Sequence, residues 1–171
     1  KDKNDLGNTL LTIIEKALSK PRTSKSHTII TIEGYSIFLS KFVNDLQKTL
    51  KNQPKIQELR LYGKNIFIDA SLNNEVWHGI NIIASSDVIA CTTDASDNKI
   101  IIDVSGRKGK DGKNARHRQH ANRESEDGLD GLPGEDGEAG QNGGNIYLIA
   151  ENKFHGRTNI EKLITSGGNG G

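Results

Sequence analysis

The 171-residue chain is poor in several residue types, and each shortage narrows what it can be. Cys91 is its only cysteine, so no disulfide framework can form within the chain. Aromatic residues make up 5% of it, and there is no methionine at all. No apolar run approaches the length that crosses a bilayer, so no membrane-spanning segment is expected.

The chain also lacks an excess of positive or negative charge. Lysine and arginine total 23 and aspartate and glutamate total 22, so the chain as a whole has no strong field to attract nucleic acid or a membrane surface. The phosphate-binding glycine-lysine loop, the Gly-x-Ser-x-Gly elbow and His-Glu-x-x-His are absent. We therefore expect no catalytic residue, no cofactor and no metal site, and we predict that the chain is not an enzyme.

Glycine is what the chain has in excess, with 19 residues. Many recur at every third position, which is the period of the polyproline II helix, a conformation without internal hydrogen bonds. A glycine in every third place leaves one bare edge that another backbone can approach. We predict extended helices at 106–113, 128–144 and 167–171 that pack along their glycines: Gly106, Gly109, Gly112, Gly128, Gly131, Gly134, Gly137, Gly140 and Gly143.

The runs GKDGKN and GLPGED resemble collagen triplets, and they also resemble the polyglycine II bundles of some phage tail-fibre adhesins and glycine-rich antifreeze proteins. Collagen requires three chains, and Gly112 and Gly128 are 16 residues apart, out of phase with a three-residue repeat. A bundle within one chain is therefore favoured over a trimer. The alternation of hydrophobic strands with Gly/Asn/Asp-rich turns is similar to the repeat regions of large bacterial adhesins and toxins.

A second repeat lies in the apolar segments. Residues 30–40 read ITIEGYSIFLS and residues 59–69 read LRLYGKNIFID, so Gly34 matches Gly63 and the Ile-Phe pair recurs. Looser copies follow at 80–90, 100–104, 146–149 and 163–164. Such self-similarity predicts repeated strand–turn–strand units, and the glycine would permit a corner in each unit.

Helical spacing of apolar residues predicts amphipathic helices over 5–19 and 41–53, each followed by a proline. Together these signals predict a mainly β fold with N-terminal helices. In it, a β-solenoid-like stack of strands is capped by the helices and carries a Gly-X-X insertion of polyproline II type. An antiparallel sandwich and a collagen-like trimer are the alternatives.

The chain divides by composition into four parts. Residues 1–54 are predicted to form the helical cap with the first strand repeat, and 55–105 the β-repeat stack. Residues 106–144 form the charged Gly-X-X insertion, and 145–171 continue the β-repeat into a glycine-rich end.

The insertion separates its charges. Its first half carries seven bases, and the stretch between Glu124 and Glu138 carries seven acids and no base. In one interpretation the basic arm lies beside the acidic arm, and in the other the bases contact a polyanion. The candidate contacts are Arg107, Lys108, Lys110, Lys113, Arg116, Arg118 and Arg123.

These observations predict a non-enzymatic structural or adhesive module of a larger secreted or surface protein, such as an adhesin or toxin. The lack of methionine and the glycine-rich ending favour a piece of a longer chain. The expected partner is a protein, a glycan or another domain of the parent, with a monomer favoured over a trimer. The alternatives are a carbohydrate-active β-helix enzyme, using Asp69, Asp87 and Asp103, and a polyanion-binding module acting through 107–123.

Overall fold

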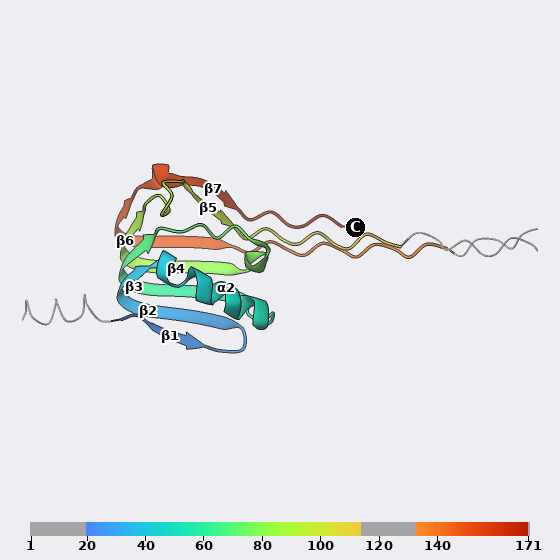
Figure 1. Ribbon diagram of the computed structural model, residues 1–171, viewed down its shortest axis with the longest axis horizontal. Coiled ribbons are helices and arrows are strands. Elements are labelled where there is room, and N and C mark those ends of the chain that lie inside the picture. The colour runs from blue at the N-terminus through green and yellow to red at the C-terminus, as the bar shows by residue number, and fades with distance from the viewer. Residues whose placement is uncertain (1–19, 114–132, 171) are drawn as a thin grey trace, which may run out of the picture.

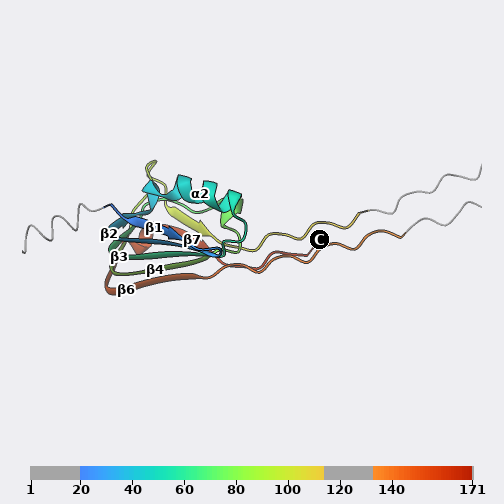
Figure 2. The same cartoon turned by 90° about the horizontal axis from the view of Figure 1, so that it is seen from below.

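The computed structural model describes residues 20–113 and 133–170, which form a two-layered body and a long thin arm (Figure 1). The helix predicted over 5–19 lies outside the described residues. The arm consists of three glycine-rich segments that leave one end of the body side by side in both views (Figures 1 and 2).

The first layer of the body is a five-stranded sheet in the order β1-β2-β3-β4-β6. Only β1 runs antiparallel to its neighbour, and all other pairs are parallel. The strands are β1 (Arg22–Lys25), β2 (Ile29–Phe38), β3 (Glu58–Ile68), β4 (Asn81–Cys91) and β6 (Ile146–His155).

The second layer covers one face of this sheet, with the helix α2 above β2 to β4 in Figure 2. It contains a two-stranded parallel sheet of β5 and β7, and an isolated bridge joins Leu72 to Ile102 beside it. The elements are η1 (Leu39–Lys41), α2 (Val43–Asn52), η2 (Glu75–Trp77), β5 (Ile100–Asp103), η3 (Arg157–Asn159) and β7 (Ile160–Ile164). The core lies between the layers, and Trp77 is fully buried in it.

The sequence repeat predicted strand–turn–strand units with a corner at the glycine, but each copy is one unbroken strand, β2 or β3, and the two strands pair side by side. The two copies align residue by residue in the sheet. Gly34 on β2 lies directly opposite Gly63 on β3, and Ile37 lies opposite Ile66. Phe38 and Phe67 stack with ring centroids 4.3 Å apart and planes 4° from parallel. Identical side chains thus form ladders across the parallel sheet, which is how the repeat stabilises its own register.

The repeated glycine marks a change in side-chain direction. On β3 the buried residues alternate up to Leu61, and the alternation resumes one position out of step at Ile66. Gly63 lies between them, and a Cβ added there would lie 2.7 Å from the carbonyl oxygen of Gly34. Since two backbones meet at this point, a residue with a side chain cannot replace the glycine without displacing a strand.

The fold class predicted from the sequence is wrong. The large sheet is mixed, because β1 pairs antiparallel and the other strands pair in parallel. No closed solenoid is present in the described residues. The predicted helix over 41–53 exists as α2, but it lies on a face of the sheet and does not cap the open end of the stack. The antiparallel sandwich is also wrong, because the long strands pair in parallel.

The cause is that successive strands return by different routes. After β2 the chain forms α2, because Leu46 and Leu50 face the core at helical spacing and Pro54 ends the pattern. After β3 it returns through η2 and a single bridge at Leu72. Only β4 and β6 are followed by return strands, β5 and β7, so the second layer never closes into a continuous sheet.

Replacing Ile66 by alanine should test this core. Ile66 is fully buried in the ladder between Ile37 and Ile89, so Ile66→Ala should lower the free energy of unfolding by about 2–5 kcal/mol. The measurement is urea denaturation followed by circular dichroism. Tyr62→Ala, on the exposed face of the same strand, is the matched control and should cost far less. Equal losses from both variants would contradict the described core.

Candidate interaction site: the glycine arm and its root

We define the glycine arm as segments 106–113, 134–144 and 165–170. The first continues from β5, the second returns to β6 and the third continues from β7 (Figure 1). The first and third segments therefore run outward and the second runs back toward the body.

The three segments are held together by backbone hydrogen bonds. The second donates to the first from Glu135, Glu138 and Gln141, at 2.8–2.9 Å. The first donates to the third from Gly106 and Gly109, and the third donates to the second from Gly168 to the carbonyl oxygen of Gln141, all at 2.8 Å. Donors within a segment are three residues apart, as a three-residue helical period requires.

Glycines lie where the segments meet. A Cβ on Gly106 would overlap the carbonyl oxygen of Gln141 and lie 2.6 Å from the nitrogen of Gly168, so all three segments converge there. A Cβ on Gly109 would overlap the carbonyl oxygen of Glu138. Because three segments of one chain fill the space around these glycines, the collagen-like trimer predicted as an alternative is not the arrangement found.

The nine predicted packing glycines are distributed as follows. Gly106, Gly109, Gly112, Gly140 and Gly143 each face the backbone of another segment. Gly134 and Gly137 lie on the returning segment, and Gly128 and Gly131 lie outside the described residues.

Two glycines with the same role were not among the predicted packing residues. A Cβ on Gly168 would overlap the carbonyl oxygen of Arg107, and one on Gly144 would overlap that of Ile80 at the base of the arm. Both belong to Gly-Gly pairs, and a strict three-residue count assigns only one member of such a pair. The second glycine of each Gly-Gly pair was the sequence feature that could have indicated these two contacts.

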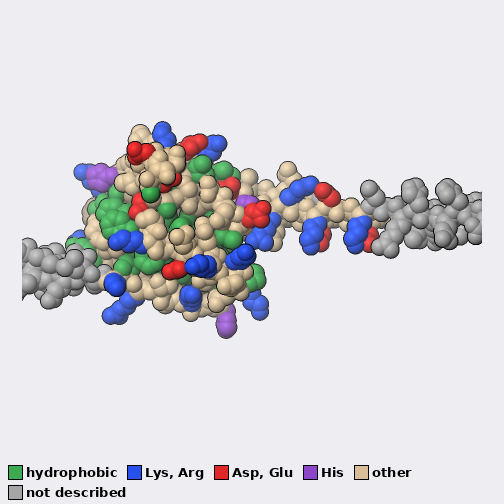
Figure 3. Space-filling view, viewed as in Figure 1, with side chains coloured by type: hydrophobic (Ala, Val, Ile, Leu, Met, Phe, Trp, Pro, Cys, Tyr) green, Lys and Arg blue, Asp and Glu red, His purple; other side chains and the backbone are tan. Residues whose placement is uncertain are grey.

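Charged side chains project outward along the arm (Figure 3). Lys110 lies 3.7 Å from Glu138 and Lys113 lies 3.0 Å from Glu135, each across two segments, whereas Lys108 pairs with nearby Asp111 at 2.7 Å. All of these side chains are more than 60% exposed, so each pair contributes at most about 1 kcal/mol. Arg116, Arg118 and Arg123 lie outside the described residues.

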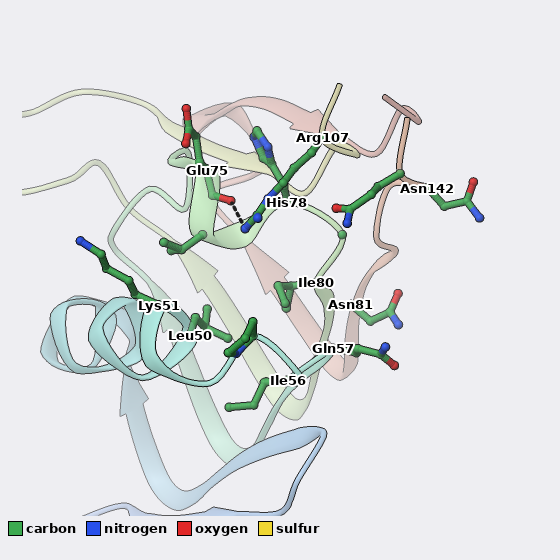
Figure 4. Close-up of a pocket in the computed structure, with 14 residues that line it drawn as sticks. Leu50, Lys51, Ile56, Gln57, Glu75, His78, Ile80, Asn81, Arg107 and Asn142 are labelled. Atoms are coloured by element: carbon green, nitrogen blue, oxygen red, sulfur yellow. Dashed lines mark hydrogen bonds between the residues drawn. The ribbon is translucent and has the colours of Figure 1, made fainter. Parts of the chain in front are cut away.

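At the root of the arm a hollow of about 730 Å³ lies between the arm, η2 and the end of α2 (Figure 4). Arg107 reaches across it, and its Nη2 donates to the backbone oxygen of Glu75 at 3.3 Å. The N–H of Gly79 donates to Val104 and Ser105, and that of Gly144 donates to Val104 at 2.7 Å. These bonds fix the direction in which the arm leaves the body.

Two titratable groups lie near the root. Burial alone would raise the pKa of Asp103, but hydrogen bonds from Ser105 and the charge of nearby His78 outweigh it, so the pKa is lowered. Nδ1 of His78 is buried without a hydrogen-bond partner among the described residues. The Asp103 carboxylate is held by the N–H of Ser105, which donates to Oδ1 at 2.9 Å directly before the first segment of the arm.

The acids that the alternative function, a carbohydrate-active β-helix enzyme, would use each have a different partner. Asp69 accepts hydrogen bonds from the N–H and Oγ of Ser40, at 2.7 and 2.6 Å, and Asp87 lies 3.9 Å from Lys64. Burial raises the pKa of Cys91 to about 11, so it is a protonated thiol at neutral pH and not a ready nucleophile. Within 20–113 and 133–170, no group of three or more His, Cys, Asp or Glu side chains could hold a metal ion.

None of the helices in the described parts of the chain is long and apolar enough to span a membrane. No family model matches this chain, and neither a curated protein nor a solved structure matches it.

Gly109→Ala should loosen the arm while leaving the body folded. The added methyl group would overlap the Glu138 carbonyl, so the amides of Glu138 and Gln141 should lose protection from hydrogen exchange, measured by NMR. Lys110→Ala is the matched control, because its exposed side chain contributes only a surface ion pair. Unchanged protection in Gly109→Ala would contradict the packing described.

The lowered pKa of Asp103 predicts a pH-dependent stability. A carboxylate whose folded pKa is below its ordinary value of 3.8 stabilises the fold above that pH, and the stabilisation is lost as the pH falls through the folded pKa. Asp103→Asn should therefore cost about 1 kcal/mol at pH 7 and less at acid pH, as measured by urea denaturation. Asp136→Asn, an exposed change in the arm, should have no effect at either pH. A constant loss for Asp103→Asn would refute the assignment.

Proposed function

We propose that this chain is a non-enzymatic structural or adhesive module of a larger secreted or surface protein, of the adhesin or toxin type. Its body serves as a base, and the glycine arm is a stiff extension that presents side chains at a distance from that base. The observation that supports this proposal most directly is the convergence of three segments at Gly106, where each backbone lies against the others.

The arm has the properties of a spacer with a contact surface. Its glycines face inward and its charged side chains face solvent, so the outward residues can vary without disturbing the packing. The bonds from Gly79 and Gly144 join its base to the body in a fixed direction. A spacer needs this combination of internal order and a rigid attachment.

Distance measurements between the two parts would test this function. Nitroxide labels at Glu33→Cys on β2 and Asp136→Cys on the arm should give a narrow distance distribution by pulsed electron resonance, and buried Cys91 should remain unlabelled. Adding Gly106→Ala and Gly109→Ala should broaden the distribution, whereas adding Lys110→Ala should not. A distribution equally broad with and without the glycine changes would show that the arm is no spacer.

A further inference from the structure

The two edges of the five-stranded sheet differ in how they meet solvent. One edge is β1, which has four exposed residues and carries Arg22 and Lys25. The other is β6, which has ten residues, and no described strand pairs with its outer side. Short charged edge strands discourage association, and long apolar ones favour it. The sheet is therefore protected at β1 and open at β6.

The first half of the open edge, residues 146–150, is apolar on both faces, whereas the second half carries Glu151, Asn152, Lys153 and His155. Tyr147 and Ile149 are each 51% exposed on the outer face. On the inner face Leu148 is only half-buried, whereas its partner on β4, Ala84, is fully buried. The core thus continues to β6 and is left partly uncovered there. Leu163, on β7, is 48% exposed as well.

The backbone N–H and C=O groups on the outer side of β6 are positioned to pair with one more strand. The N–H of Ile82 on β4 donates to the carbonyl oxygen of Asn145, so the polar backbone groups of Asn145 face β4. Because these groups alternate along a strand, those of Ile146, Leu148 and Ala150 face the open edge. They present donors and acceptors at alternate positions along the apolar run 146–150.

We propose that a second copy of this chain adds to this edge, with the two β6 strands antiparallel and a two-fold axis at Leu148. Leu148 then exchanges hydrogen bonds with its own equivalent, and Ile146 does so with Ala150 of the partner subunit. Tyr147 lies beside Ile149 of the partner subunit as a non-hydrogen-bonded pair, the closer of the two antiparallel pair types.

The pattern of β6 itself selects a second copy and this register. The regular run 146–150 is bounded by the arm root at Asn145 and by an irregularity in the β4–β6 register after Ala150. Leu148 is its centre, so only a two-fold axis there pairs every apolar residue with another. Glu151 then falls opposite Asn145 of the partner subunit, and no like charges meet.

The position of the arm excludes the parallel alternative. The arm joins the body at the Asn145 end of β6 (Figure 1). Strands in a sheet lie ~4.8 Å apart, too close for two three-segment arms to leave side by side. Antiparallel addition directs the two arms to opposite ends, giving a double-ended particle. This inference rests on the body alone and does not depend on the spacer role of the arm.

Site-specific cross-linking would test both the dimer and its register. Full-length Tyr147→Cys and a size-tagged Ile149→Cys, mixed and mildly oxidised, should give a disulfide-linked heterodimer. Each variant alone should cross-link poorly, because Tyr147 does not face its own equivalent. Both side chains are half-exposed, so neither change should prevent folding. A Tyr62→Cys control on interior strand β3 should not cross-link with either.

Sedimentation equilibrium supplies the independent measurement. The unmodified chain should be a dimer, Leu148→Lys should weaken self-association roughly tenfold or more, and Gly109→Ala should leave it unchanged. A monomer at all concentrations, a dimer insensitive to Leu148→Lys, or efficient cross-linking of Tyr147→Cys to itself would each overturn the proposal. If the proposed spacer function fails while the heterodimer forms, the edge pairing stands.

Discussion

Parallel pairing at one end of the body is the constraint on which the rest of the structure depends. β5 and β7 run in the same direction, so the segments that follow them leave the body together. β6 begins level with β4, where Oδ1 of Asn81 accepts a hydrogen bond from the N–H of Asn145 at 2.9 Å, so the returning segment arrives at the same end. Three glycine-rich segments that are far apart in the sequence therefore meet, and without this register the arm would have no third member.

The arm gains its order in a different way from the body. The body buries apolar side chains between two layers, as the fully buried Ile37, Ile66 and Trp77 show. The arm has almost none to bury, and its segments are joined by backbone hydrogen bonds at glycines and by surface ion pairs that contribute little. Its stability is therefore local and depends on the attachment at Gly79 and Gly144, whereas its outward side chains are free to serve recognition.

The extent to which the structure could be predicted differs between these two parts. The match of ITIEGYSIFLS with LRLYGKNIFID predicted repeated strand–turn–strand units, and the strands were right: the two copies are β2 and β3, with Gly34 opposite Gly63 and no corner at either glycine. The predicted fold class was wrong because strand periodicity does not reveal which element connects one strand to the next. The chain forms α2 after β2, a single bridge at Leu72 after β3, and the strand β5 after β4. The basic residues suggested a polyanion contact, yet Lys110 and Lys113 each lie beside an acid from another segment, a pairing that depends on how the segments align.

The sequence by itself determined the local elements: the strands, the helix α2 ended by Pro54, and the three-residue glycine period, since each follows from side-chain size and spacing along a short stretch of chain. Only the tertiary structure decided that the returning segment runs antiparallel to its two neighbours and that Gly144 and Gly168 also lie at contacts. It also decided that the sheet is protected at β1 but open at β6. The reason is that these properties depend on which segments, far apart in the sequence, have backbones in contact. The spacing of residues within one segment does not specify those contacts.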